Sequence, residues 1–174
     1  MRIYVAIVFV CVGILFSNNI WGQSRQLVTV VVYKNGSAII ECKKVTEGVG
    51  YFKSTEADVG KYWISSQTNI ALQAGLKKAL SWAKLNEEHK KAFEKEITRI
   101  RVTDKETYEF YRKYISEFAK EVKLVFYGHE DGSFELKLTE DFVDITLVTT
   151  EGVSNFIKLL QGKSVNKDID EIFN

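Results

Sequence analysis

Apolar residues on either side of Asn35-Gly36 predict a β-hairpin between Gln26 and Lys44. Asn-Gly between two apolar runs is the strongest short-range hairpin signal, because both residues tolerate the positive φ angles of a two-residue type I′ turn. Counting outward from such a turn gives an uncharged face with the pairs Tyr33 with Ala38, Val31 with Ile40 and Thr29 with Cys42. We expect this face, and Cys42 with it, to point into the core.

A second hairpin is predicted around Asp131-Gly132, between residues 122–129 and 134–139. The same count places on its more apolar face the pairs Val125 with Leu138, Tyr127 with Leu136 and His129 with Phe134. Shorter apolar stretches predict further strands at residues 61–65, 97–102 and 142–148.

Three segments carry the 3.6-residue apolar spacing of a helix that packs on a core. The first runs from Ile70 to about Leu85 and has on one side Leu72, Leu76, Ala79, Leu80 and Ala83. The second runs from Asp104 to Val122, begins with a Thr103/Glu106 capping box and has on one face Tyr108, Tyr111, Tyr114, Ile115 and Phe118. The third is short, ends at Gly162 and turns inward Val153, Phe156, Ile157 and Leu160.

The predicted strands come as hairpins and meanders and do not alternate one by one with helices. This order favours an α+β fold: an antiparallel sheet built from hairpins and a meander, with about three helices packed on one face. Of the 174 residues, 45% are hydrophobic and 27% are charged, proportions typical of a globular protein and not of a disordered one. The sequence shows no internal repeat.

The first 23 residues have the layout of a secretory signal. Arg2 supplies a positive charge, residues 3–16 form an uncharged and mostly apolar run, and residues 17–19 begin a polar segment. The run is shorter than the roughly 20 apolar residues that a membrane-spanning helix needs. An uncleaved anchor and a buried helix are the alternatives.

We therefore expect a signal peptide at 1–23, cut between Gly22 and Arg25, a single domain at 24–162 and a polar C-terminal tail at 163–174. The protein would be exported, to the periplasm or the extracellular space. It would meet a membrane only during export or through an uncleaved leader.

Charge and cysteine content narrow the choice of partners. Removing residues 1–23 takes away Arg2 alone, which leaves 24 − 1 = 23 basic residues against 23 acidic ones. Proteins that bind nucleic acid usually carry a strong basic excess, since neutralising phosphates drives their affinity, so we expect no nucleic-acid partner. Cys42 is the one cysteine after position 23, and no intramolecular disulfide is expected there.

No group of residues matches a catalytic, metal or cofactor motif. Ser81 and Lys84 have the Ser-x-x-Lys spacing of penicillin-recognising enzymes, but the Ser-Asp-Asn and Lys-Thr-Gly elements of those enzymes are missing. His89 and His129 lie beside charged or turn residues, while Cys42 is predicted inside a strand, so neither a Cys–His pair nor a metal cluster is expected. We expect no cofactor, no metal ion and no catalytic residue.

Four aromatic residues are our candidate binding patch, because they fall outside the predicted apolar stripes or lie next to each other on a strand: Tyr62, Trp63, Trp82 and Phe110. The preferred function is an exported, non-catalytic binding or protein-interaction domain whose partner is an unidentified protein or a small apolar ligand. The alternatives are a small extracytoplasmic hydrolase that depends on carboxylates, since 23 acidic residues allow many pairs, and an inhibitor of a secreted enzyme.

Overall fold

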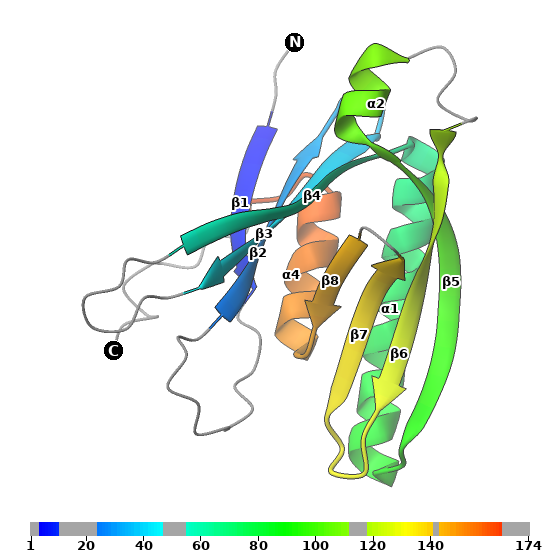
Figure 1. The fold of residues 1–174 in the computed structure, drawn as a ribbon. Coiled ribbons are helices and arrows are strands. Elements are labelled where there is room, and N and C mark those ends of the chain that lie inside the picture. Colours follow the sequence, from blue (N-terminus) through cyan, green and yellow to red (C-terminus); the bar gives the residue numbers. More distant parts are fainter. Residues whose placement is uncertain (1–3, 11–23, 47–54, 112–117, 141–142, 165–174) are drawn as a thin grey trace.

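The computed structural model describes residues 4–10, 24–46, 55–111, 118–140 and 143–164. Eight strands form one sheet in which each strand is antiparallel to the next in the chain (Figure 1). The strands are β1 Tyr4–Val10, β2 Ser24–Val32, β3 Ala38–Thr46, β4 Thr55–Ile64, β5 Phe93–Asp104, β6 Lys120–Gly128, β7 Phe134–Glu140 and β8 Val143–Leu147. The predicted α+β class and the antiparallel meander are confirmed.

The first strand comes from the segment that the sequence assigns to a leader. Residues 4–10 pair with β2 over its length from Val32 back to Gln26. The structure thus places residues 4–10 of the apolar run in the edge strand of the sheet, and export remains a prediction from the sequence.

The sheet is strongly curved. Strands β4 and β5 share two residue pairs, Tyr62 with Asp104 and Trp63 with Thr103, so the sheet splays open there into two halves. The far edge then returns toward the first half, because the main-chain N–H of Thr146 in β8 donates a 2.9 Å hydrogen bond to the side chain of Gln26 in β2. Curvature of this kind encloses a core on the concave side.

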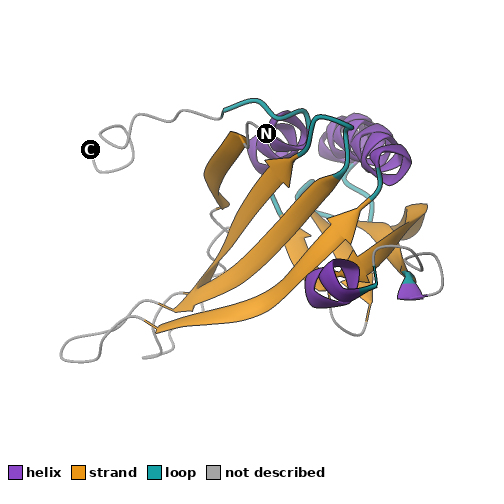
Figure 2. Cartoon of the chain, turned by 90° about the horizontal axis from the view of Figure 1, so that it is seen from above, coloured by secondary structure: helices purple, strands orange, loops and turns teal. Residues whose placement is uncertain are grey.

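The described residues include the helices α1 Ser66–His89, α2 Lys105–Phe110 and α4 Thr150–Leu160. Helices α1 and α4 lie side by side on one face of the sheet, whereas α2 lies on the opposite side (Figure 2). Each long helix begins at a hydroxyl cap, since Ser65 accepts from the N–H of Thr68 and Thr149 accepts from the N–H of Gly152. Helix α4 ends at Leu160, and Gly162, the predicted stop residue, follows with a φ of 71° in a Schellman turn.

The core fills the space between the sheet and the two long helices. Its largest fully buried side chains include Phe126, Phe156, Ile40, Leu72, Leu76 and Leu124. Helix α1 approaches the sheet closely at Gly75, where a Cβ would lie 2.9 Å from Cγ2 of Thr98 and 3.0 Å from Cδ2 of Leu124. The predicted apolar stripe of α1 is confirmed, and the helix continues one turn beyond its expected end to include the buried Asn86.

The register of the first hairpin was predicted one residue out of place. Val30, and not Val31, lies opposite Ile40, and Val28, and not Thr29, lies opposite Cys42. The cause is the loop, which has three residues: Gly36 alone has a positive φ, of 82°, and Tyr33 and Ser37 close the turn through their main-chain groups. A type I turn followed by a left-handed glycine adds one residue to the two-residue loop that the sequence suggested.

The second hairpin contains the same error for the same reason. Its pairs are Leu124 with Leu138, Phe126 with Leu136 and Gly128 with Phe134, and its left-handed residue is Gly132 with a φ of 91°. The strands of both hairpins were predicted correctly. The predicted burial of Cys42 is also confirmed, since its exposed fraction is 0%.

The helix predicted from Asp104 to Val122 is much shorter. Asp104, and not Thr103, is its cap, because its carboxylate accepts from the N–H groups of Glu106 and Thr107. The described helix ends at Phe110, and Val122 is a buried residue of β6. Tyr114 and Ile115 lie outside the described residues.

The two halves of the molecule repeat one order of elements, which the sequence did not reveal. A hairpin, a third antiparallel strand and a helix follow one another as β2, β3, β4 and α1 and again as β6, β7, β8 and α4. The hairpin turns match in detail, because Asn35 and Asp131 each accept from the N–H and the hydroxyl of a serine two residues later. Within the described residues the same order of three strands and a helix therefore occurs twice.

Candidate functional site

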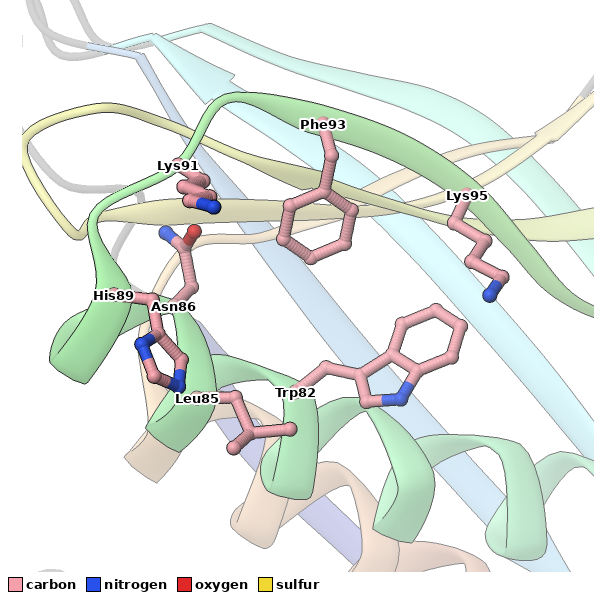
Figure 3. A pocket seen from close by; sticks show the side chains of 7 residues that line it. All are labelled: Trp82, Leu85, Asn86, His89, Lys91, Phe93 and Lys95. Atoms are coloured by element: carbon pink, nitrogen blue, oxygen red, sulfur yellow. The ribbon is translucent and has the colours of Figure 1, made fainter.

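A hollow of about 430 Å³ lies between the C-terminal half of α1 and the beginning of β5. Trp82, Leu85, Asn86 and His89 line it from α1, and Lys91, Phe93 and Lys95 line it from the segment that returns along the sheet (Figure 3). The two sides meet because α1 ends at Lys90, whose left-handed conformation with a φ of 49° reverses the chain. The hollow is thus the inside of a helix–turn–strand corner.

Trp82 and Phe93 form the aromatic wall of this hollow, and a stack of buried rings lies behind them. The rings of Phe93 and Phe126 lie 5.4 Å apart, and those of Phe126 and Phe134 lie 5.3 Å apart, both nearly parallel. Trp82 meets Phe126 edge-on at 5.9 Å and Phe93 at 6.3 Å. One edge of the indole therefore anchors in the core, while its half-buried ring borders the hollow.

Gly128 makes room for this arrangement. It lies opposite Phe93 in the sheet. A Cβ at that position would stand 2.7 Å from the Phe93 ring and 2.7 Å from Oδ1 of Asn86. Both side chains lie over β6 because this residue has no side chain of its own.

Asn86 fastens the inner end of the hollow to the second hairpin turn. Its Nδ2 donates to the main-chain oxygen of Ser133 at 2.7 Å and to that of His129 at 3.2 Å. Its Oδ1 is buried and accepts no hydrogen bond from the described residues.

Lysine side chains surround the open side of the hollow. The ammonium groups of Lys78 and Lys95 lie 5.0 and 5.4 Å from the centre of the Trp82 ring, within the range of a cation–π contact. Lys91 lies in the turn between α1 and β5. The lining side chains contribute two lysines and a histidine but no carboxylate.

A second hollow, of about 340 Å³, is polar and lies beside α2. Two of the three carboxylates in its lining have partners: Asp104 caps α2, and Glu109 lies 3.4 Å from Lys105; the third carboxylate is that of Glu106. Lys61, also in its lining, lies 2.9 Å from Glu41. The cap joins the end of β5 to the start of α2, whereas one ion pair lies within α2 and the other between β3 and β4.

The four residues of the predicted binding patch lie at two ends of β5 and not in one place. Trp82 lies beside Phe93, the first residue of β5, whereas Tyr62 and Trp63 pair with Asp104 and Thr103 at its end. Tyr62 belongs to the core with an exposed fraction of 6%, and its phenol lies over Gly60, where a Cβ would clash with it. Burial, and then the nearby Cys42 and Asp104, raise the pKa of Tyr62 above its ordinary value.

Trp63 and Phe110 lie on the α2 side of the sheet. The indole of Trp63 stacks on Tyr108 at 4.6 Å with an angle of 11° between the rings. Phe110 is 83% exposed and continues through Tyr111 to Phe118 as a row of ring contacts. Residues 112–117, which connect this row along the chain, lie outside the described residues.

Of the predicted residues, Trp82 alone borders the hollow. Sequence reasoning missed its partners Asn86, Phe93 and Lys95, although Phe93 falls just after a charged stretch that ends a helix. Among the described residues no group of three or more His, Cys, Asp or Glu side chains could hold a metal ion. Nor does any described helix combine the length and the apolar character needed to cross a membrane.

The chain was compared with protein families, curated proteins and solved structures. No protein-family model, no curated protein and no solved structure matches this chain.

Proposed function

We propose that the protein is an exported, non-catalytic binding domain and that the hollow beside Trp82 is its ligand site. The observation that carries this proposal is the half-buried indole of Trp82, held edge-on by Phe126 while its ring borders an apolar hollow. A volume of about 430 Å³ falls in the usual range of sites for small ligands, roughly 300 to 1,000 Å³. Export is inferred from the N-terminal layout of the sequence.

Exposed apolar side chains around one concavity support a binding role. Leu85 and Phe93 keep 50% and 37% of their surface in contact with solvent, and both line the hollow. Covering apolar area contributes about 25 cal/mol for each Å² removed from water. A bound molecule would therefore gain binding free energy by covering apolar surface that the fold leaves exposed to solvent.

The carboxylate-dependent hydrolase is the less favoured function. Three described carboxylates line a concavity, and two of them are already engaged: Asp104 is a helix cap and Glu109 is an ion-pair partner, which leaves Glu106 without a second unengaged carboxylate in that lining. A general base needs a free oxygen within reach of the substrate's proton. The geometry of the described residues offers more to ligand binding than to proton transfer.

Native mass spectrometry of the protein purified from its own host tests this function. We expect a bound small molecule that is absent from the Trp82→Ala variant and retained by the Phe110→Ala variant, which removes an exposed aromatic side chain far from the hollow. Circular dichroism would establish that both variants fold. A preparation that carries no molecule at Trp82, or a molecule that the protein cleaves on incubation, would contradict a non-catalytic binding role.

A further inference from the structure

We propose that the ligand of this hollow is an aromatic carboxylate, a compound with a flat apolar body and one anionic group. This inference rests on the proposed binding function and adds the chemical class of the ligand. Two independent features of the hollow carry it, the aromatic wall and the set of lysines around the opening.

The wall selects a flat apolar body. Trp82 and Phe93 stand at 69° to each other and leave between them a corner open to solvent (Figure 3). An aromatic ring in this corner would meet one side chain face to face and the other edge-on, the two arrangements that aromatic pairs favour. Leu85 would cover the remaining side of such a ring.

The lysines select a negative charge. Lys78, Lys91 and Lys95 form no ion pair with the residues that the structure describes. Acidic residues further along β5 and β6 are engaged elsewhere, because Glu96 and Glu121 both bind Arg99 at 2.7 and 2.8 Å. The side chains that line the hollow therefore carry positive charge with no carboxylate among them to balance it.

Charge also argues against the other ligand class that aromatic corners bind. Quaternary ammonium groups are recognised by the faces of Trp, Tyr and Phe rings. Here the ammonium groups of Lys78 and Lys95 already lie near the Trp82 ring. A cationic ligand would be repelled by both, whereas a carboxylate would draw them toward itself.

A set of three naphthalene probes tests the proposal on the full chain. The probes are 2-naphthylacetate, its neutral primary amide and the cationic 2-naphthylethylammonium, which share one apolar body and differ in charge. Calorimetry would give the affinities, and the indole N–H signal of Trp82 in NMR spectra would report the place of binding. We expect the carboxylate to bind most tightly and to shift the Trp82 signal.

Two double lysine variants distinguish the effect of charge beside the hollow from the effect of the protein's overall charge. The double variant Lys91→Gln with Lys95→Gln should bind the carboxylate about three- to tenfold more weakly, the range expected for two exposed ion pairs, and the amide unchanged. The control, Lys77→Gln with Lys84→Gln, removes the same charge from exposed positions of α1 outside the lining and should leave both affinities unchanged. Salt should weaken the carboxylate's advantage in the parent protein.

Each contrary result has a distinct meaning. Equal affinity for the three probes at Trp82, or tighter binding of the ammonium compound, would overturn the carboxylate proposal and leave the binding function standing. A Trp82 signal that no probe moves would overturn the ligand class and the location of the site together. An equal loss of affinity in both lysine double variants would show that overall charge, and not this hollow, attracts the anion.

Discussion

Asn69 and Asn86 fasten the two hairpin turns of the sheet to the same helix. They lie 86 − 69 = 17 residues apart on α1, about 25 Å along its axis. Asn69 donates to the main-chain oxygen of Gly36 in the first turn at 2.9 Å, and Asn86 donates to that of Ser133 in the second at 2.7 Å. Both side chains are buried, so one carboxamide fixes the position of each turn relative to helix α1.

Replacing either asparagine by alanine should destabilise the fold by about 1 to 3 kcal/mol, because buried carbonyl groups would lose their donor. Each Nδ2 donates to two main-chain oxygens, but Asn69 should be the more sensitive of the two, since its Oδ1 also accepts from Gln73 whereas that of Asn86 accepts from no described residue. Urea unfolding followed by circular dichroism measures the change. Gln67→Ala, at an exposed position of α1, is the control and should have little effect; equal losses in all three variants would contradict a specific role.

The acid sensitivity of the fold should depend in part on Asp131. Hydrogen bonds from the hydroxyl and the N–H of Ser133 hold the pKa of Asp131 below its ordinary value of 3.8. A carboxylate with a lowered pKa adds stability above its ordinary value, and this stability is lost as the pH falls through the folded-state pKa. Asp131→Asn should therefore leave stability at pH 7 nearly unchanged and reduce its decline between about pH 5 and 2.

The first turn provides the reciprocal experiment, because Asn35 makes with Ser37 the bonds that Asp131 makes with Ser133. Asn35→Asp should add acid sensitivity where Asp131→Asn removes it. Unfolding free energies measured across this pH range test both. Identical pH profiles in the parent and both variants would show that these turns do not couple to folding through their charge.

Gly75→Ala should destabilise the protein even though alanine favours helix. In an exposed helix the exchange stabilises by about 1 kcal/mol. Here the new methyl group would press on Thr98 and Leu124, at 2.9 and 3.0 Å, and move α1 away from β5 and β6. We expect a net loss of about 1 to 2 kcal/mol in thermal or urea unfolding; a more stable variant would mean that the helix–sheet contact is easily relaxed.

Cys42 should not react with thiol reagents in the folded protein. Its side chain is fully buried on β3, opposite Val28 and Gly60. Accessible, deprotonated thiols react, and buried ones in apolar surroundings do not. In a Cys11→Ser background, labelling by a disulfide reagent should follow global unfolding as urea is raised, and rapid labelling without urea would contradict the burial.

The sequence predicted the elements better than their exact alignment. Period-two alternation and the Asn-Gly and Asp-Gly pairs located both hairpins, yet the register was one residue off in each. Gly36 and Gly132 alone carry the positive φ, whereas the prediction required it of Asn35 and Asp131 as well. The Asn-Gly or Asp-Gly dipeptide indicates that a turn exists. The length of the loop depends also on the hydrogen bonds that the following serine makes with the Asn or Asp side chain.

The helix after Asp104 and the hollow were harder to foresee for a different reason. The spacing of Tyr108, Tyr111 and Phe118 is compatible with a long helix, but Tyr111 leaves the helical conformation with a φ of −116°. Trp82 stood out because it lies off the apolar stripe of α1. Its partner Phe93 reaches it only because Lys90 reverses the chain and Gly128 leaves space, and both depend on tertiary structure.

The pairing of Tyr4–Val10 with β2 has a consequence for the processing of the chain. The same seven residues cannot serve as a translocation signal that is cut away and as a permanent strand. Processing near Gly22 would leave β2 outermost, with a row of N–H and C=O groups open to another extended segment. Sequencing the natural N-terminus would therefore decide whether β1 or β2 forms this edge of the sheet.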